Sequence, residues 1–451
     1  MDKIILCGTL VTGDGKTLVN NKAVWIRGGK FCDITDFSAV SPDVQAEIVH
    51  AEDKLVVPGA INHHTHGCTL GPLFPSATTP VSEEKAIANL WRHLSQGTTT
   101  VCNVDGMGTP EETLRINRQV PIKLYTSTAN TPKNVEAAEI VDGKGLRAEH
   151  RALTTDEMLR CGAVAVGEMG GGHTLGGGGQ DYLYIPNAFE KRTGIRISTA
   201  QARELKFAAL GRYMSGDESE RDMDRVAALL ESSGLSDKIS AEEAVQLIKD
   251  CVLPSIATSL AGFEEGCRTA IMNSVPFILH NSAPSVKKIE ALLLKYGKDI
   301  QLVAGHCNHD TFTVDESVYW ARRLKELGAI IDVGTFDLTD YSQQQTGGDP
   351  EYFDAMIRSG LADIISTDYN GGCWDGLYTG VARIVEKGYM GLAEAVALCT
   401  GNLRKVLPLL AKNSGLIEPG FDADFVVADC NNVGNIRAVY IDGQLVYQCK
   451  E

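Results

Sequence analysis

The stretch VVPGAINHHTH, residues 56–66, decides how the rest of this sequence is interpreted. It reads as a short apolar strand that ends in His64-Thr65-His66. Residues two apart on an extended strand point to the same side, so both imidazoles can face one cavity and share one cation. The neighbouring His63 should point the other way, and we expect it to pack in the interior.

Similar short apolar strands alternate with amphipathic helical patterns between about residues 58 and 414, which is typical of βα units. The candidate strands are GAINHHTH, TTTVCNVDG, IKLYTST, GAVAVGEM, VPFILHN, IQLVAGH, AIIDVG and ADIISTD. Eight βα units predict an α/β fold in which the strands close into a TIM (β/α)8 barrel.

Both ends of the chain lie outside this pattern. Residues 1–57 and 415–451 read as short strands with turns, including a hairpin signal at Asp442-Gly443, and we expect them to form one small β-domain beside the barrel of residues 58–414. After the fourth strand, a long helical segment at about residues 180–268 predicts an insertion. It could act as a lid, a substrate-binding element or an oligomer contact.

Five of the eight predicted strands end in residues that bind metals well. These residues are His64, His66, Glu168, His280, His306 and Asp368. The C-terminal ends of barrel strands line the active site, so the six side chains should converge. Each has an ordinary explanation alone, such as a helix cap for Asp368. Together, four imidazoles and two carboxylates indicate a site for Zn²⁺, Fe²⁺ or Mn²⁺ and not for Ca²⁺ or Mg²⁺ alone.

Several further residues are candidates for contact with a substrate. His173 lies in the Gly-rich stretch GGGHTLGGGGQ and is either a catalytic side chain or a solvated loop residue. The free N–H groups of that stretch could bind an anion, or the glycines could form a hinge for the insertion. Because they closely follow metal-ligand candidates, four residues are predicted to line the substrate pocket: Asn281, Asn308, His309 and Tyr369. Asn281 could equally cap a helix, and Asn308 and His309 could instead orient a metal ligand.

The motifs VVPGAINHHTH, VGEMG, ILHNS, VAGHCN and ISTDYN together resemble those of the amidohydrolase superfamily. The tail GLIEPGFDADFVVAD is similar to the stretch by which that superfamily leaves its barrel and re-enters a β-sandwich. The resemblance covers nearly the whole chain except the insertion. It implies a distorted barrel with a small β-sandwich made from both termini and a binuclear metal site. In that site His64, His66 and Asp368 would hold one cation, and His280 and His306 the other.

The bridge between the two cations distinguishes subgroups of that superfamily. Many members use a carbamylated lysine on the fourth strand, whereas this strand ends in Glu168. VGEMG is most similar to the bridging glutamate of enamidase, which hydrolyses a cyclic enamide to an aldehyde and ammonia, and glutamate bridges also occur in some deacetylases and adenine deaminases. The resemblance therefore implies two divalent metal ions, with zinc expected and iron or manganese as alternatives.

Such a site predicts a metal-dependent hydrolase that cleaves a C–N bond of a small cyclic amide or enamide through a metal-bridging hydroxide. Asp368 would take the proton of the water and return it to the leaving nitrogen. A deaminase of an aminated heterocycle and an N-acyl amino acid deacylase are the alternatives. A barrel that serves only as a scaffold is a fourth reading, but it predicts missing ligands, and all six are present.

Composition narrows the class of protein further. The chain has 451 residues, 43% of them hydrophobic, and a formal net charge of −16, which argues against a nucleic-acid-binding surface. Its 12 cysteines form no C-x-x-C pair, and we find neither a signal peptide nor an uninterrupted apolar run that could span a membrane. We expect a cytoplasmic homo-oligomer that acts on a small molecule and binds neither nucleic acid nor membrane.

Overall fold

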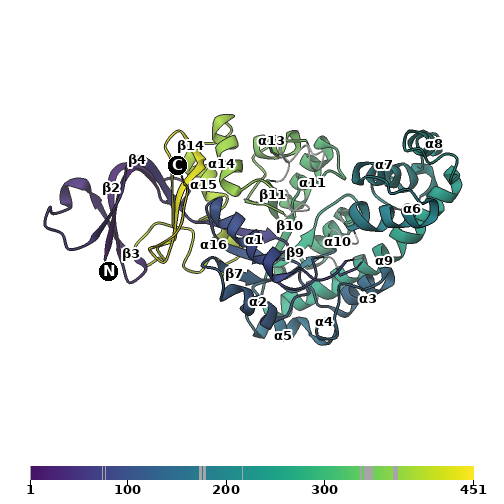
Figure 1. Cartoon of the computed structure of the whole chain (residues 1–451), viewed down its shortest axis with the longest axis horizontal. Helices are drawn as coiled ribbons and strands as arrows, with labels where there is room; N and C mark the ends of the chain where they lie inside the picture. The colour runs from purple at the N-terminus through teal and green to yellow at the C-terminus, as the bar shows by residue number, and fades with distance from the viewer. Residues whose placement is uncertain are drawn as a thin grey trace.

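The computed structural model describes residues 2–73, 75–76, 78–171, 175, 179–215, 217–335, 338–339, 349–368 and 374–450. A β-sheet built from the two ends of the chain lies at one end of the molecule (Figure 1). Helices α6 (Ile185–Thr193), α7 (Thr199–Leu210) and α8 (Met223–Ser232) lie at the opposite end, and the alternating strands and helices of the middle of the chain lie between them.

The central strands follow the predicted order along the chain. They are β5 (Ala60–Thr65), β6 (Thr98–Asn103), β7 (Lys123–Thr126), β8 (Val166–Met169), β9 (Phe277–His280), β10 (Leu302–Gly305), β11 (Ile330–Gly334) and β12 (Ile364–Ser366). They pair in parallel as a three-stranded sheet, β5-β6-β7, and a five-stranded sheet, β12-β11-β10-β9-β8. The α/β class predicted from the sequence is therefore confirmed.

The two sheets approach each other at both edges. An isolated parallel bridge between Thr128 and Val166 links β7 to β8. At the other edge, the N–H of Asp368 donates to the carbonyl of His64 over 3.1 Å. The strands described here form no ladder between β12 and β5. The structure thus has the strand order of the expected barrel without showing a closed barrel.

Helices cover these strands. Strands β8, β9 and β10 are buried at every position, as expected for parallel strands covered on both faces. Side chains cap several helices at their N-termini, for example the reciprocal capping box of Thr313 and Glu316 at the start of α11. Among the described residues, this region also contains α1 (Glu83–Ser95), α2 (Pro110–Asn117), α3 (Pro132–Val141), α4 (Ala148–Ala152), α5 (Thr155–Arg160), α10 (Val286–Tyr296), α11 (Val314–Glu326), α13 (Glu351–Arg358), α14 (Leu377–Glu386), α15 (Leu392–Ala397) and α16 (Leu403–Val406).

The terminal β-domain joins both ends of the chain, as predicted. Its strands are β1 (Lys3–Val11), β2 (Leu18–Arg27), β3 (Lys30–Asp36), β4 (Glu47–Pro58), β13 (Phe425–Asp429), β14 (Asn432–Ile441) and β15 (Gln444–Gln448). They form one mixed sheet in the order β15-β14-β13-β4-β1-β2-β3, which supports the predicted sandwich in part. Strand β4 joins the strands of the two chain ends, because it pairs with β1 on one side and with β13 on the other. A core of its own, including Phe31, Phe425 and Tyr440, stabilises this domain.

The segment after β8 is helical and ends in α9 (Ala241–Asn273). The C-terminal half of α9 packs against the strands as the crossover helix between β8 and β9. Close packing depends on a small residue at Gly266, since a Cβ there would lie 2.9 Å from Cε2 of Phe277. Helices α6, α7 and α8 extend beyond this crossover.

Among the described residues, α9 is the one helix long and apolar enough to cross a membrane by length and composition. Its best window has a mean hydropathy of 1.2, and 39% of that window is buried inside the protein. The sequence analysis looked for an uninterrupted apolar run. This test instead averages hydropathy over an 18-residue window, so α9 passes it although the helix contains charged residues. Because the core helix of a soluble protein passes the same test, the measure alone is weak support for a membrane span.

Candidate metal centre

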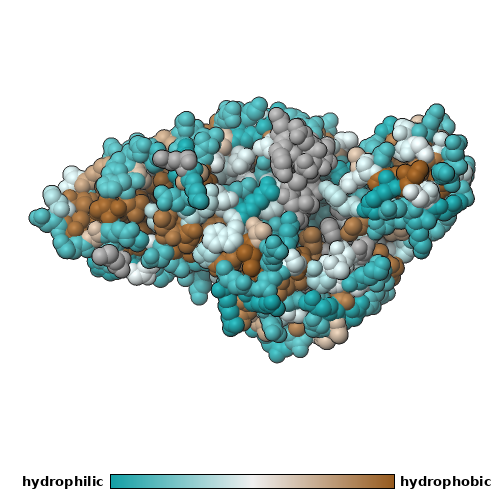
Figure 2. Space-filling model, in the orientation of Figure 1, coloured by the Kyte–Doolittle hydropathy of each residue, from teal (hydrophilic) through white to brown (hydrophobic). Residues whose placement is uncertain are grey.

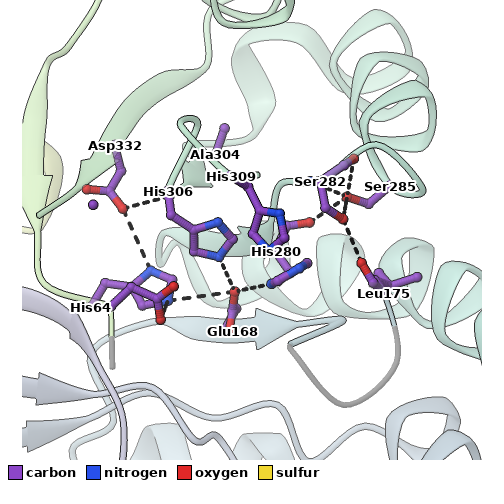
Figure 3. Close-up of polar contacts among 12 residues, drawn as sticks. His64, Glu168, Leu175, His280, Ser282, Ser285, Ala304, His306, His309 and Asp332 are labelled. Carbon is purple, nitrogen blue, oxygen red and sulfur yellow. Dashed lines mark hydrogen bonds and ion pairs between the residues drawn. The ribbon is translucent and has the colours of Figure 1, made fainter. Parts of the chain in front are cut away.

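Six side chains predicted to bind metal converge at the C-terminal ends of the strands. His64 lies on β5 and Glu168 on β8, while His280 is the last residue of β9. His66, His306 and Asp368 follow β5, β10 and β12 within two residues. In Figure 3 the imidazoles of His64, His280 and His306 surround the carboxylate of Glu168. Residues as much as 304 positions apart are thus brought to one place.

Glu168 is shared by two groups of potential metal ligands. One group is His64, His66 and Glu168, and the other is Glu168, His280 and His306, with the ligand atoms of each group within 4.8 Å of one another. Oε1 of Glu168 lies 3.0 Å from Nδ1 of His280 and 3.0 Å from Nε2 of His306. Oε2 lies 3.4 Å from Nε2 of His66. Nε2 of His64 lies 3.6 Å from Oε1, so three of the four imidazoles face one oxygen of the carboxylate and His66 faces the other.

Asp368 approaches the same site from the end of β12. Its Oδ1 lies 3.5 Å from Nε2 of His66 and 4.0 Å from Nε2 of His64. Both Asp368 and His306 have a positive φ, 39° and 35°, which is uncommon for residues other than glycine. Such conformations cost about 1–3 kcal/mol and concentrate at functional sites. Backbone strain at two candidate ligands is therefore consistent with a functional site.

The unpaired nitrogens of the site fit divalent cations. Within the part of the chain that the structure describes, both ring nitrogens of His64, Nε2 of His280 and Nδ1 of His306 are buried without a hydrogen-bond partner. A buried polar atom left in this state costs about 1–3 kcal/mol. Imidazole nitrogens and carboxylate oxygens are the ligands that zinc and similar transition metals prefer. The donor set and its unpaired nitrogens therefore fit ions of this kind.

The side chains of the site shift one another's pKa values. Burial would raise the pKa of Glu168, but the nearby His64 and hydrogen bonds from His280 and His306 hold it well below its usual range. Burial would lower the pKa of His306, but Asp368 and Glu168 raise it to about 9. The pKa of His66 is likewise raised well above its usual value by Asp105 and Glu168 in spite of burial. At neutral pH the metal-free site thus holds protons that a cation must displace.

Two carboxylates near the ligands were not singled out from the sequence. Asp105 accepts a hydrogen bond from Nδ1 of His66 over 2.8 Å, which leaves Nε2 of His66 facing Glu168. Asp332 lies 3.3 Å from Nε2 of His63, which is fully buried as predicted. Both aspartates lie near the ends of predicted strands, TTTVCNVDG and AIIDVG. That position could have identified them from the sequence as residues near the site.

The loop after β9 is fixed by two serines (Figure 3). The hydroxyl of Ser285 donates to the carbonyl of His280 over 2.6 Å. The hydroxyl of Ser282 donates to the carbonyl of Leu175 over 2.8 Å. These bonds hold the end of β9, and with it His280, against the segment that follows β8.

His309, one of the predicted substrate contacts, lies beside two of the candidate ligands. Its ring centroid is 5.1 Å from that of His280 and 5.3 Å from that of His306. The N–H of Thr311 donates to Nδ1 of His309 over 3.2 Å, which assigns the proton of a neutral ring to Nε2. Burial, followed by repulsion from His280 and His306, lowers the pKa of His309 well below its usual value. His309 is therefore a neutral imidazole beside the metal centre.

The other predicted contacts have different positions. The side-chain amide of Asn308 exchanges two hydrogen bonds with the backbone of Gly334, of 2.9 and 2.8 Å, so it ties β10 to β11. Asn281 is completely buried and does not line an accessible surface. His173 and Tyr369 lie outside the described residues. Of the side chains predicted to touch substrate, the structure brings His309 to the metal centre.

The helical segment after β8 reaches the centre through charged side chains of α7. Nζ of Lys206 lies 2.5 Å from Oδ1 of Asp181, and both side chains are buried. Arg203 pairs with Asp181 and also with Asp310, which follows His309 in the chain. This charged cluster fixes α7 to the loop that carries His309.

Comparisons with known proteins agree with this geometry. A model of the amidohydrolase family matches residues 256–446, which include His280, His306 and Asp368. No curated protein matches the chain significantly by sequence.

The fold is shared with many solved structures. One is a Xaa-Pro dipeptidase with bound methionine, at a TM-score of 0.56 and 16% identity, with 100% of each chain covered. A second is enamidase, at 0.52 and 16%, covering 99% of this chain and 96% of that one. A third is a zinc-bound adenosine deaminase from Xanthomonas campestris, at 0.52 and 15%, covering 98% and 92%. The family model thus covers the C-terminal part of the barrel region, and these solved structures share the fold of the whole chain.

Proposed function

We propose that this protein is a metal-dependent hydrolase that cleaves a C–N bond of a small cyclic amide or enamide. The observation that carries the proposal is the carboxylate of Glu168, which is shared by two sets of potential ligands, one with His64 and His66 and the other with His280 and His306. Two cations on either side of one carboxylate are the arrangement by which hydrolases activate water between metals.

The proposed cofactor is a pair of divalent ions, with zinc first and iron or manganese as alternatives. His64, His66 and Asp368 would hold one ion, His280 and His306 the other, and Glu168 would bridge them. When bound, the ions would supply a water of lowered pKa and would polarise the substrate carbonyl or imine. A solved structure with the same fold has zinc bound.

Asp368 is the residue proposed to move the proton. Its side chain is 20% exposed, whereas the side chain of Glu168 is 1% exposed. Asp368 is thus the more accessible of the two carboxylates and can reach both water and substrate. It would accept the proton of the attacking water and deliver it to the leaving nitrogen.

His309 is proposed to orient the substrate. Because Nδ1 accepts a hydrogen bond from Thr311, the proton on Nε2 is available for a substrate oxygen or nitrogen. A neutral donor fixed beside the reacting atoms stabilises charge that develops in the transition state. The cluster of α7 and Asp310 would hold this donor in place.

The test is product analysis with the zinc-loaded protein and a panel of lactams, cyclic enamides, aminoheterocycles and N-acyl amino acids. Ammonia together with an aldehyde from a cyclic enamide, or ring opening of a lactam, would support the proposal. Ammonia from an aminoheterocycle would identify a deaminase, and an amino acid from an N-acyl substrate would identify a deacylase. No turnover of any C–N substrate would refute it.

The Asp368→Asn variant tests whether the activity depends on the proposed acid–base residue. Loss of a general acid–base residue lowers kcat about 100- to 10,000-fold. Asp363→Asn is the matched control, because Asp363 lies near the opposite end of β12, where it pairs with Lys325. The control should retain the activity of the unmodified protein.

A further inference from the structure

One buried carboxylate near the metal centre has no part in the proposed reaction. Asp332 lies on β11, the strand whose neighbours β10 and β12 both lead into candidate ligands. Its side chain is fully buried. A buried charge requires compensation by hydrogen bonds or opposite charges. The groups that compensate Asp332 belong to three different strand ends.

The contacts of Asp332 divide between its two oxygens. Oδ1 lies 3.3 Å from Nε2 of His63. Oδ2 accepts hydrogen bonds from the backbone N–H of His306 over 2.9 Å and from the hydroxyl of Ser366 over 2.8 Å. Nδ1 of His64 lies 3.9 Å from the same oxygen, within ion-pair distance but beyond a hydrogen bond. In Figure 3 Asp332 lies on the side of His64 and His306 away from Glu168.

The bond to His306 explains the unusual backbone of that residue. His306 has a φ of 35°, a conformation that a residue with a side chain adopts only when its surroundings hold it there. The carboxylate of Asp332 receives the N–H of His306 in this conformation, while its imidazole lies 3.0 Å from Glu168. Removing the charge would weaken the bond that supports the strained geometry.

We propose that Asp332 is a positioning residue for both metal ions, which orients His306 through its backbone and His64 through the Nδ1 side of its ring. The proposal rests on the proposed metal-dependent function. Through His64 and His306, Asp332 acts on one ligand of each ion without touching either ion. Outer carboxylates that orient metal-bound histidines commonly change metal affinity about 10- to 100-fold.

The experiment is a titration of metal-free protein with Co²⁺ alone, followed by the visible absorption of the bound ion. For Asp332→Asn we expect an affinity about 10- to 100-fold weaker and a shifted absorption band, because the ligand geometry changes. Asp363→Asn is again the control, since it removes an equivalent charge at the far end of the strands and should leave both readouts unchanged. Circular dichroism establishes that each variant is folded.

The outcomes separate this proposal from the proposed function. If the unmodified protein takes up no Co²⁺, the metal-dependent function itself fails. If it binds Co²⁺ and folded Asp332→Asn matches it in affinity and spectrum, only the role of Asp332 is overturned. Should Asp332→Asn not fold, Ser366→Ala carries the test, because it removes one hydrogen bond from Oδ2 and keeps the charge. We then expect a smaller weakening and a spectral shift, and an unchanged spectrum would overturn the proposal.

Discussion

Oε1 of Glu168 lies 3.0 Å from Nε2 of His306, although 138 residues separate the two in the chain. His280 reaches the same oxygen from a third strand. A carboxylate on one strand end thus contacts imidazoles from two other strands of the same sheet. The account of this protein as a metal-dependent hydrolase depends on that relationship.

Replacing Glu168 tests the shared carboxylate. Glu168→Gln keeps the size of the side chain but removes the charge that would attract both ions. We expect the bound metal to fall from two ions per chain to one or none, with an affinity at least about 100-fold weaker. Metal analysis after dialysis measures this. Glu112→Gln is the control, because Glu112 is also buried beside a histidine, His150, but outside the site. Equal metal content in both variants would contradict the prediction.

His309 should affect catalysis without affecting metal content. His309→Gln removes a donor fixed beside His280 and His306, and we expect kcat/KM to fall about 100-fold. The bound metal should remain at the level of the unmodified protein. His150→Gln, which changes a buried histidine far from the ligands, should keep full activity. A fall in metal content in step with activity would show that His309 acts as a ligand and not as a donor.

Metal binding should depend on pH in a defined direction. The pKa of His306 is raised to about 9 in the metal-free protein, so at pH 7 its ring holds a proton that a metal ion must displace. Affinity should rise with pH and level off above about 9, and uptake at pH 7 should release protons to an indicator dye. Uptake without proton release would contradict the prediction.

The same group makes the stability of the metal-free protein depend on pH. Because the pKa in the folded state is raised above the usual value of 6.5, the proton on His306 stabilises the fold below pH 6.5. This contribution is lost as the pH rises through about 9. Urea unfolding of metal-free protein across this range measures the loss, which added zinc should abolish.

The charged cluster of α7 should stabilise the fold in a non-additive way. Lys206→Met leaves Asp181 with less compensation in a buried position and should lower the free energy of unfolding by about 3–5 kcal/mol. The double variant Lys206→Met/Asp181→Leu removes both charges, and we expect it to recover most of that loss. Urea unfolding of the three proteins provides the comparison. A double variant less stable than Lys206→Met would contradict the account.

The sequence predicted which residues lie at the C-terminal ends of the strands, because a simple rule relates apolar runs to parallel strands. Parallel strands read as apolar runs, and imidazoles or acids at their C-terminal ends were expected to converge, as His64, Glu168 and Asp368 do. Apolar runs do not predict how individual side chains pack against one another. A Cβ at Gly305 would lie 2.9 Å from Cε1 of His64, so that glycine makes room for a ligand from another strand. No local sequence pattern predicts that contact.

Side-chain roles were harder to predict than positions. Asn308 follows a ligand, as a substrate contact would, but the register of β10 and β11 places its amide against Gly334. Asp332 belongs to no histidine motif, so its link to His306 depends on which strands are neighbours. Likewise β4 joins the strands of the two chain ends into one continuous sheet, a pairing that the separate strand patterns do not reveal.

The most direct test of the central claim is anomalous diffraction at the zinc absorption edge from crystals of the zinc-loaded protein. The account predicts two peaks on either side of the Glu168 carboxylate, one beside His64 and His66 and the other beside His280 and His306. A single peak, no peak, or zinc bound away from Glu168 would contradict it.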